Sequence, residues 1–112
     1  MSTATVRVKY DGSTLSLSND GSTWSSDCSF LTNVSPNGKI EWVTETNGLT
    51  ITNIEITVNN DKILKKSPYE QDGVWYAKIK DKDSGRATYV IQYSVNGVEQ
   101  PEFDPEMIIK RT

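Results

Sequence analysis

Histidine is absent from this 112-residue sequence, and its absence excludes much of the common chemistry of proteins. Imidazole is the usual general base, and it belongs to the serine and cysteine catalytic triads and to most zinc sites. A hydrolase built on paired carboxylates would not need it. The candidate carboxylates are Asp81, Asp83, Glu99, Glu102, Asp104 and Glu106. No pattern places two of them across a cleft, so we interpret them as solvated loop charges and expect the protein not to be an enzyme.

The sequence has one cysteine, Cys28, so no internal disulfide can form and a disulfide-stapled secreted scaffold is excluded. Its neighbour Asp27 is an anion, which disfavours a reactive thiolate, and we interpret Cys28 as a small core or edge residue. The opening "MSTATVRVKY" lacks the apolar core of a signal peptide. No run of ~18 apolar residues predicts a membrane-spanning helix. We expect a cytoplasmic protein with no membrane partner, unless a leader has been removed.

Clustered positive charge is also scarce. Lys and Arg number 12 against 15 Asp and Glu, which gives a formal net charge of −3. Binding to the phosphates of nucleic acid needs clustered Lys and Arg. The densest basic groups, residues 62–66 and Lys110-Arg111, are short. We interpret both as solvated surface and expect no nucleic-acid partner.

Apolar residues alternate with polar ones in short segments along most of the chain, which is typical of strands that bury one face. The segments are "TVRVKY", "TLSLS", "KIEWVT", "NIEITV", "VWYAKIK", "ATYVIQYSV" and "EMIIKR". The turn signals between them are Asp20-Gly21, Asn37-Gly38, Asn47-Gly48, Asp72-Gly73 and Asn96-Gly97. These pairs suit turns with positive φ. We predict an all-β fold, a Greek-key β-sandwich of about seven to nine strands that forms a single domain over residues 1–112.

The segment 49–58 changes the parity of its apolar residues: they fall on odd positions up to Ile51 and on even positions from Ile54. A β-bulge at Thr52-Asn53 would exchange the two faces in this way. A bend that carries the strand into the other sheet would do the same. The sequence leaves both explanations open.

Two acidic motifs have the hard oxygen ligands that calcium prefers. "DGST" begins at Asp11 and again at Asp20, and "DKDSG" contains Asp81 and Asp83. Two copies do not make a repeat array. "DKDSG" does not match an EF-hand loop, and lysines alternate with its acids. We interpret the first motif as two similar turns and the second as a charged hairpin turn, and we predict no metal or other cofactor.

The motifs "VRVKYDG", "PNGKIEWV" and "GVWYAKI…TYVIQYSV" resemble, in their order along the chain, a cupredoxin-like or immunoglobulin-like β-sandwich. Copper-binding members of the cupredoxin family hold the metal with two histidines, one cysteine and a weak axial ligand. This sequence has no histidine, and its cysteine lies early, whereas the family's ligand cysteine falls in a late loop. The resemblance therefore implies the scaffold without the copper site.

The end of the chain is similar to small bacterial inclusion-body proteins of the AidA/PixA kind. The similarity rests on "YVIQYSVNG" and on "FDPEMIIK", in which an Asp-Pro pair precedes an apolar strand. Pro105 has a fixed φ, and its ring favours an extended backbone at Asp104. This resemblance implies a non-enzymatic role in accumulation or interaction.

Aromatic residues are the best candidates for contacts with a partner. Trp42 alternates with Ile40, so we expect it in the core. Trp75 and Tyr76 are consecutive and must point to opposite faces, so one of them is expected to face outward or toward a partner chain. Trp24 lies in the Ser/Thr-rich stretch "GSTWSSD" and is expected to be exposed.

We predict a non-catalytic binding or self-association module that contacts a protein partner or a second copy of itself. A homodimer would form through whichever of Trp75 and Tyr76 faces outward, since exposed apolar patches usually mark interfaces. The alternative is a small lectin-like carbohydrate-binding protein. Its ligand contacts would come from Trp24 and from the loop residues Asn19, Asn33 and Asn47.

Overall fold

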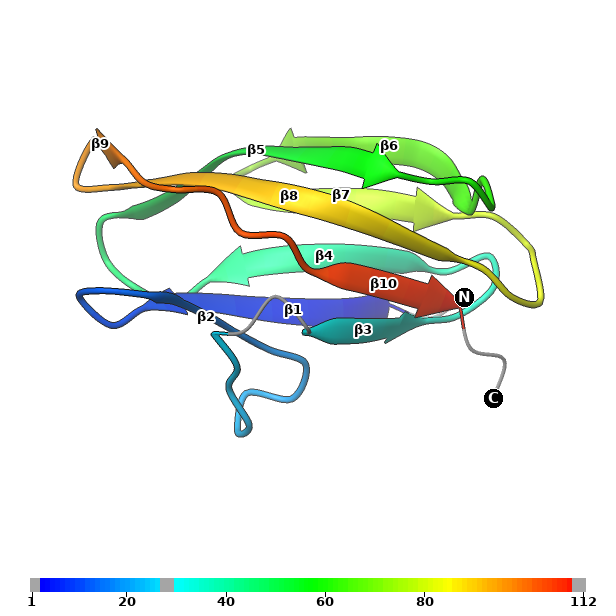
Figure 1. Ribbon diagram of the computed structural model, residues 1–112, viewed down its shortest axis with the longest axis horizontal. Coiled ribbons are helices and arrows are strands. Elements are labelled where there is room, and N and C mark those ends of the chain that lie inside the picture. The colour runs from blue at the N-terminus through cyan, green and yellow to red at the C-terminus, as the bar shows by residue number, and fades with distance from the viewer. Residues whose placement is uncertain (1–2, 27–29, 110–112) are drawn as a thin grey trace.

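The computed structural model describes residues 3–26 and 30–109, which form ten β-strands and no helix (Figure 1). The strands are β1 (Thr3–Tyr10), β2 (Leu15–Ser18), β3 (Leu31–Val34), β4 (Lys39–Thr44), β5 (Leu49–Val58), β6 (Leu64–Gln71), β7 (Val74–Ile79), β8 (Arg86–Val95), β9 (Val98–Glu99) and β10 (Glu106–Ile109). The all-β prediction is confirmed. No helix within these two ranges is long and apolar enough to cross a membrane. Cys28 lies outside the described residues.

The strands form two sheets that pack face to face. The first sheet has the order β2-β1-β4-β7-β6, and the second has the order β3-β10-β8-β5, with β9 paired to β8. The successive strands β2, β3, β4, β5 and β6 alternate between the two sheets, and the chain crosses again from β7 to β8, as Greek-key sandwiches do. Most neighbours are antiparallel, but β1 runs parallel to β4 and β3 runs parallel to β10. In Figure 1 the strands of the two sheets run nearly along one direction, which is the aligned packing of a sandwich.

The core lies between the two sheets and is filled by the residues that alternate inward along each strand. Trp42 of β4 is fully buried there, as the sequence predicts, and its ring meets the edge of the fully buried Tyr89 ring of β8. The ring centroids are 5.2 Å apart. The Trp42 Nε1–H donates a hydrogen bond to the Tyr89 hydroxyl at 3.3 Å, so the polar atoms of this aromatic pair satisfy each other.

The parity change in β5 is a β-bulge. The pairing of β5 with β8 shifts register between Ile51 and Asn53, and the residues on both sides of the shift still pair with β8. The bulge is therefore confirmed, and the alternative of a bend into the other sheet is wrong. A second register shift lies between Ile56 and Val58. Beyond it the apolar side chains of β5 no longer point into the core, and Val58 is 49% exposed.

The sequence predicts seven to nine strands, and the structure has ten because β3, β6 and β9 carry little alternation. β6 is an edge strand whose lysines are exposed, and its pairing with β7 has two register shifts. Pro68 lies within it, and proline is tolerated in strands mainly at sheet edges. An edge strand with bulges and a proline does not need a repeating apolar face, so its sequence resembles a loop.

Candidate functional site

The outer face of the first sheet gathers positive charge in an otherwise acidic chain. On β7, Ala77 and Ile79 are buried, so the intervening side chains point away from the core. The strand registers extend this outward set to the neighbouring strands. Its charged members are Arg7, Lys9, Lys39, Lys66 and Lys78 against Glu41 and Glu45. Five cations against two carboxylates give this surface, which we call the basic face, a charge of +3.

Tyr76 is the outward member of the Trp75–Tyr76 pair. It lies opposite Tyr69 of β6, and their ring centroids are 5.8 Å apart. The Lys39 ammonium lies 4.9 Å from the centre of the Tyr76 ring, and the Lys66 ammonium lies 4.4 Å from that of Tyr69. Cations in this position are attracted by the electron-rich ring face. The basic face therefore carries a tyrosine pair flanked by lysines.

Trp75 points inward and has a structural role. Its side chain is half-buried against the core, and its Nε1–H donates to the main-chain carbonyl of Ile51 at 3.2 Å. Ile51 lies beside the bulge of β5, the edge strand of the second sheet. Trp75 therefore connects the two sheets along one side of the sandwich, and it is not the outward contact residue.

Trp24 is half-buried rather than freely exposed. The Lys9 ammonium lies 4.1 Å from the centre of its ring. The next residue, Ser25, exchanges two main-chain hydrogen bonds with Leu17 of β2, at 2.8 and 2.9 Å. The loop therefore runs along the edge of the first sheet, and one face of the indole lies against a cation.

The three asparagines proposed for carbohydrate do not meet Trp24 in one place. Asn19 uses its carboxamide within the protein: its Nδ2 donates to the carbonyl of Leu31, and its Oδ1 accepts from the hydroxyl of Thr32, both at 2.9 Å. Asn33 is exposed and lines a shallow hollow with Asn19. Neither Trp24 nor Asn47, which is exposed in the turn between β4 and β5, lines that hollow.

The two "DGST" motifs are turns of the same kind, as interpreted. Each aspartate accepts the main-chain N–H groups of the residues two and three positions later, at 2.8 to 2.9 Å. The N–H of Thr14, followed by that of Ser13, lowers the pKa of Asp11 to about 2. The N–H of Thr23 is the main cause that lowers the pKa of Asp20. Within residues 3–26 and 30–109, no three carboxylate or thiol side chains come together as a metal site would need.

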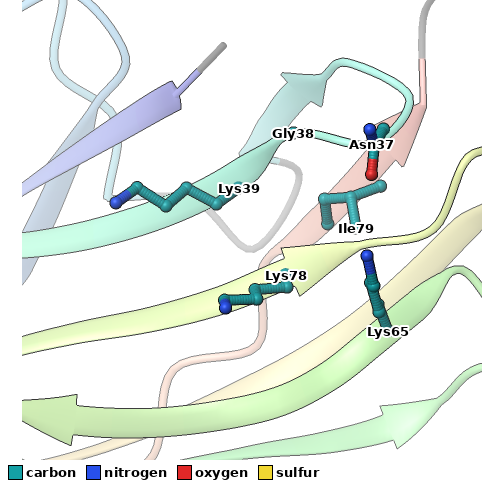
Figure 2. Close-up of a pocket in the computed structure, with 6 residues that line it drawn as sticks. All are labelled: Asn37, Gly38, Lys39, Lys65, Lys78 and Ile79. Carbon is teal, nitrogen blue, oxygen red and sulfur yellow. The ribbon is translucent and has the colours of Figure 1, made fainter. Parts of the chain in front are cut away.

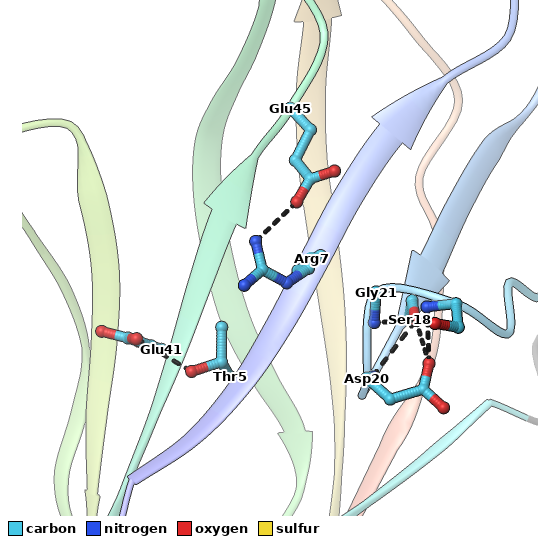
Figure 3. Close-up of polar contacts among 8 residues, drawn as sticks. Thr5, Arg7, Ser18, Asp20, Gly21, Glu41 and Glu45 are labelled. Carbon is cyan, nitrogen blue, oxygen red and sulfur yellow. Dashed lines mark hydrogen bonds and ion pairs between the residues drawn. The ribbon is translucent and has the colours of Figure 1, made fainter.

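The carboxylates of the basic face are already engaged by β1. Glu45 forms an ion pair with Arg7 at 2.7 Å, and Glu41 accepts a hydrogen bond from the Thr5 hydroxyl at 2.9 Å (Figure 3). The other ion pair between two described residues joins Arg86 and Glu106 on the second sheet. Among the described residues, no acid therefore forms an ion pair with a lysine of the basic face.

A group of lysines that the sequence does not reveal surrounds a hollow at one end of the basic face. The hollow has a volume of about 190 Å³ and is lined by Asn37, Gly38, Lys39, Lys65, Lys78 and Ile79 (Figure 2). Its lysines come from three strands, β4, β6 and β7, so they are far apart in the sequence. Only the strand pairing brings them together. Comparisons with known proteins assign no role to these residues: no protein-family model matches the chain, and no curated protein matches it.

Proposed function

We propose that this protein is a non-catalytic binding module that self-associates, and that the basic face is one of its two contact surfaces. The observation that carries the proposal is the outward tyrosine pair, Tyr69 and Tyr76, flanked by lysines with which no described carboxylate forms an ion pair. Tyrosine is enriched at the centres of protein interfaces, and unpaired charges around it select a partner of opposite charge. The proposed contact needs no metal or other cofactor.

The outer face of the second sheet supplies the opposite charge. Its charged members among the described residues are Glu55, Glu99, Glu102, Asp104 and Glu106 against Arg86. Five carboxylates against one guanidinium give the described part of this surface, which we call the acidic face, a charge of −4. Two of these carboxylates are fixed by neighbours: Glu102 accepts from the Gln92 amide at 2.6 Å, and Glu99 accepts from the Thr52 hydroxyl at 3.4 Å.

The charges favour contact between unlike faces. A two-fold dimer through the basic face would place lysines of one copy against lysines of the other, which costs free energy. Stacking the basic face of one copy on the acidic face of the next pairs opposite charges. Such a head-to-tail contact leaves one free face at each end of the pair, so it extends into open chains unless the rotation between copies closes a ring. We therefore propose chains in place of the homodimer expected from the outward aromatic residue.

The strand order supports the immunoglobulin-like part of the resemblance. β4-β7-β6 and β10-β8-β5 correspond to the B-E-D and G-F-C strands of immunoglobulin sandwiches. These sandwiches often serve as binding domains, and the inclusion-body resemblance also implies interaction without catalysis. A chain with a single cysteine requires no oxidising compartment, so we place the protein in the cytoplasm.

The lectin-like alternative has weaker support. A sugar ring stacks on the free face of an aromatic side chain, and Lys9 lies over the Trp24 ring. The Asn19 carboxamide has both its groups bonded within the protein, so a ligand would have to displace Leu31 or Thr32.

Sedimentation velocity over a concentration series tests the proposal. At low salt the average sedimentation coefficient should rise with protein concentration, and added salt should abolish the rise because it screens charges. Lys78→Glu on the basic face and Glu55→Lys on the acidic face should each weaken the association. Lys62→Glu is the control, since Lys62 is an exposed residue of the loop between β5 and β6.

Mixing the two charge-reversed variants tests most directly whether the two unlike faces contact each other. The unaltered acidic face of Lys78→Glu still fits the unaltered basic face of Glu55→Lys, and the two altered faces are again complementary. An equimolar mixture should therefore form more heterodimer than either variant forms homodimer. A sedimentation coefficient that is independent of concentration and salt would refute self-association. Association that Tyr76→Ala and both charge reversals leave unchanged would refute the assignment of the faces.

A further inference from the structure

We propose that the hollow lined by Lys39, Lys65 and Lys78 binds a tetrahedral oxyanion, either phosphate or sulfate, as the free ion or as an ester. Lys39 and Lys78 belong to the basic face and Lys65 does not, so the site overlaps the stacking contact described above only in part. Three features support this site: a fixed wall, a row of opposed lysines, and a lining without an acidic side chain among the described residues.

The wall of the hollow is the turn that leads into β4. The Gly38 N–H donates to the Ser35 carbonyl at 3.0 Å, and Asn37 adopts a φ of 58°. Two further main-chain hydrogen bonds hold this turn against the end of β7. The Asn37 N–H donates to the Lys80 carbonyl at 3.0 Å, and the Ile79 N–H donates to the Gly38 carbonyl at 2.9 Å. The turn and the end of β7 are therefore fixed relative to each other, so the site exists before a ligand arrives.

Lysines lie directly opposite one another across three neighbouring strands. Lys78 of β7 is in register with Lys39 of β4 on one side and with Lys66 of β6 on the other. Like charges directly opposite in a sheet are destabilising. Tyrosine rings stabilise the ammonium groups of Lys39 and Lys66, but among the described residues Lys78 and Lys65 have no such ring. In the described part of the chain, no carboxylate forms an ion pair with any of these four lysines.

A bound anion would remove this repulsion. Of the residues that the structure describes, no acidic side chain lines the hollow, and the nearest acid along β4, Glu41, already accepts from Thr5. Lysine binds phosphate as a point charge on a flexible stem, so it does not require the planar two-oxygen geometry that arginine matches. Cations that approach from three strands suit an ion whose oxygens point in several directions, whereas a planar carboxylate offers two oxygens in one plane.

The geometry of the hollow fits a small ligand. Its volume of about 190 Å³ lies below the ~300–1,000 Å³ of sites for drug-sized molecules. Figure 2 shows the Lys65 ammonium near Ile79 and Asn37, whereas the Lys39 and Lys78 side chains extend along their strands away from Lys65. The exposed Asn37 carboxamide adds a neutral donor at the same rim. An oxyanion in the hollow would meet Lys65 and Asn37 first, and the flexible stems of Lys39 and Lys78 would let their ammonium groups turn toward it, while the rest of an esterified ligand would lie outside.

Titration of the ¹⁵N-labelled full chain, followed by amide chemical shifts, tests the proposal. The probes are inorganic phosphate, inorganic sulfate and phenyl phosphate, at mildly alkaline pH and in enough salt to keep the chain monomeric. Sodium chloride at matched ionic strength is the control. We expect saturable shifts at residues 37–39, 65–66 and 78–80 with an oxyanion and not with chloride. Tighter binding of phenyl phosphate than of the free ions would identify an ester as the ligand, and equal binding would identify the free ion.

Three variants separate this site from a general charge effect. Lys65→Gln and Lys78→Gln should each weaken binding about tenfold or more, as the loss of a hydrogen bond to a charged group does. Lys62→Gln removes the same charge outside the hollow and should leave the affinity within about twofold. Lys65→Gln should not change self-association, so failure of one proposal is distinguishable from failure of the other. Shifts that chloride reproduces, or an equal loss in Lys62→Gln, would overturn the site.

Discussion

Replacing Tyr89 by phenylalanine isolates the contribution of one buried hydroxyl. Tyr89 and Trp42 are both fully buried, and their rings meet edge to face with an interplanar angle of 68°. Phenylalanine keeps the ring, so this aromatic contact is retained. The substitution removes the acceptor at 3.3 Å from the Trp42 Nε1 and leaves that N–H without a partner in the core.

The expected loss follows from that unpaired donor. A buried polar group that loses its hydrogen bond costs about 1–3 kcal/mol. With a denaturant dependence of about 2 kcal/mol per molar urea, the midpoint of unfolding should fall by about 0.5–1.5 M. Because the ring remains, no large cavity adds to this value.

The same substitution should change the response to alkali. Burial raises the pKa of Tyr89 above its ordinary value of 10.0. A neutral Tyr89 therefore contributes fully to stability below pH 10, and this contribution is lost as the pH rises above that value toward the folded-state pKa. A phenylalanine ring cannot ionise, so the decline of stability above pH 10 should be shallower in Tyr89→Phe. Burial also raises the pKa of Tyr93, so part of the decline in stability at high pH should remain in the variant.

Urea unfolding followed by tryptophan fluorescence, at neutral and at alkaline pH, measures both effects. Tyr69→Phe is the matched control, because Tyr69 is half-buried on the outer face and its hydroxyl has no hydrogen-bond partner among the described residues. Its free energy of unfolding should stay within about 0.5 kcal/mol of the parent chain. An unchanged midpoint in Tyr89→Phe, or an equal loss in Tyr69→Phe, would refute the reasoning.

Two further predictions concern turns. Gly85 has a φ of 139°, and a Cβ there would lie 2.5 Å from the Ile63 Cγ2, whereas a Cβ at Gly73 would meet nothing within 4 Å. In thermal unfolding, Gly85→Ala should therefore lose about 1–3 kcal/mol more stability than Gly73→Ala. Equal losses in the two variants would contradict the proposed clash. Main-chain N–H groups lower the pKa of Asp11 from 3.8 to about 2, so its charge stabilises the fold above pH 3.8 and this contribution is lost as the pH falls toward 2. Acid unfolding followed by circular dichroism should therefore be less steep between these pH values in Asp11→Asn, and an unaltered profile would contradict this assignment.

Much of the fold is predictable because one face of each core strand is buried. Alternation identifies β1, β4, β7 and β8, and the parity change near Asn53 identifies the bulge. The orientation of Trp75 also follows from alternation with Ala77 and Ile79 once these are assigned to the core. Edge strands are harder to predict from the sequence. β6 pairs with a neighbouring strand on one side only, and its exposed residues do not need to alternate between polar and apolar.

The candidate site is less predictable because it depends on pairing between distant segments. Lys39 and Lys78 are neighbours only through the register of β4 with β7, and no spacing along the chain encodes that register. The structural role of Asn19 has the same origin, because its partners Leu31 and Thr32 lie beyond a loop. Single residues can be assigned to strands or turns from sequence, but their neighbours across strands cannot.

The parallel pairing of β3 with β10 has a consequence for the order of folding. β3 lies at the edge of the second sheet, and among the described strands its one sheet neighbour is β10, which follows the other nine in the sequence. On a ribosome, residues 31–34 are therefore made early but have no strand to pair with until residues 106–109 have emerged. The hairpin of β1 and β2, by contrast, needs no later segment to pair. Closing the second sheet is then a late, long-range step, and chains released before β10 would expose β3 and the β8 edge that β10 covers.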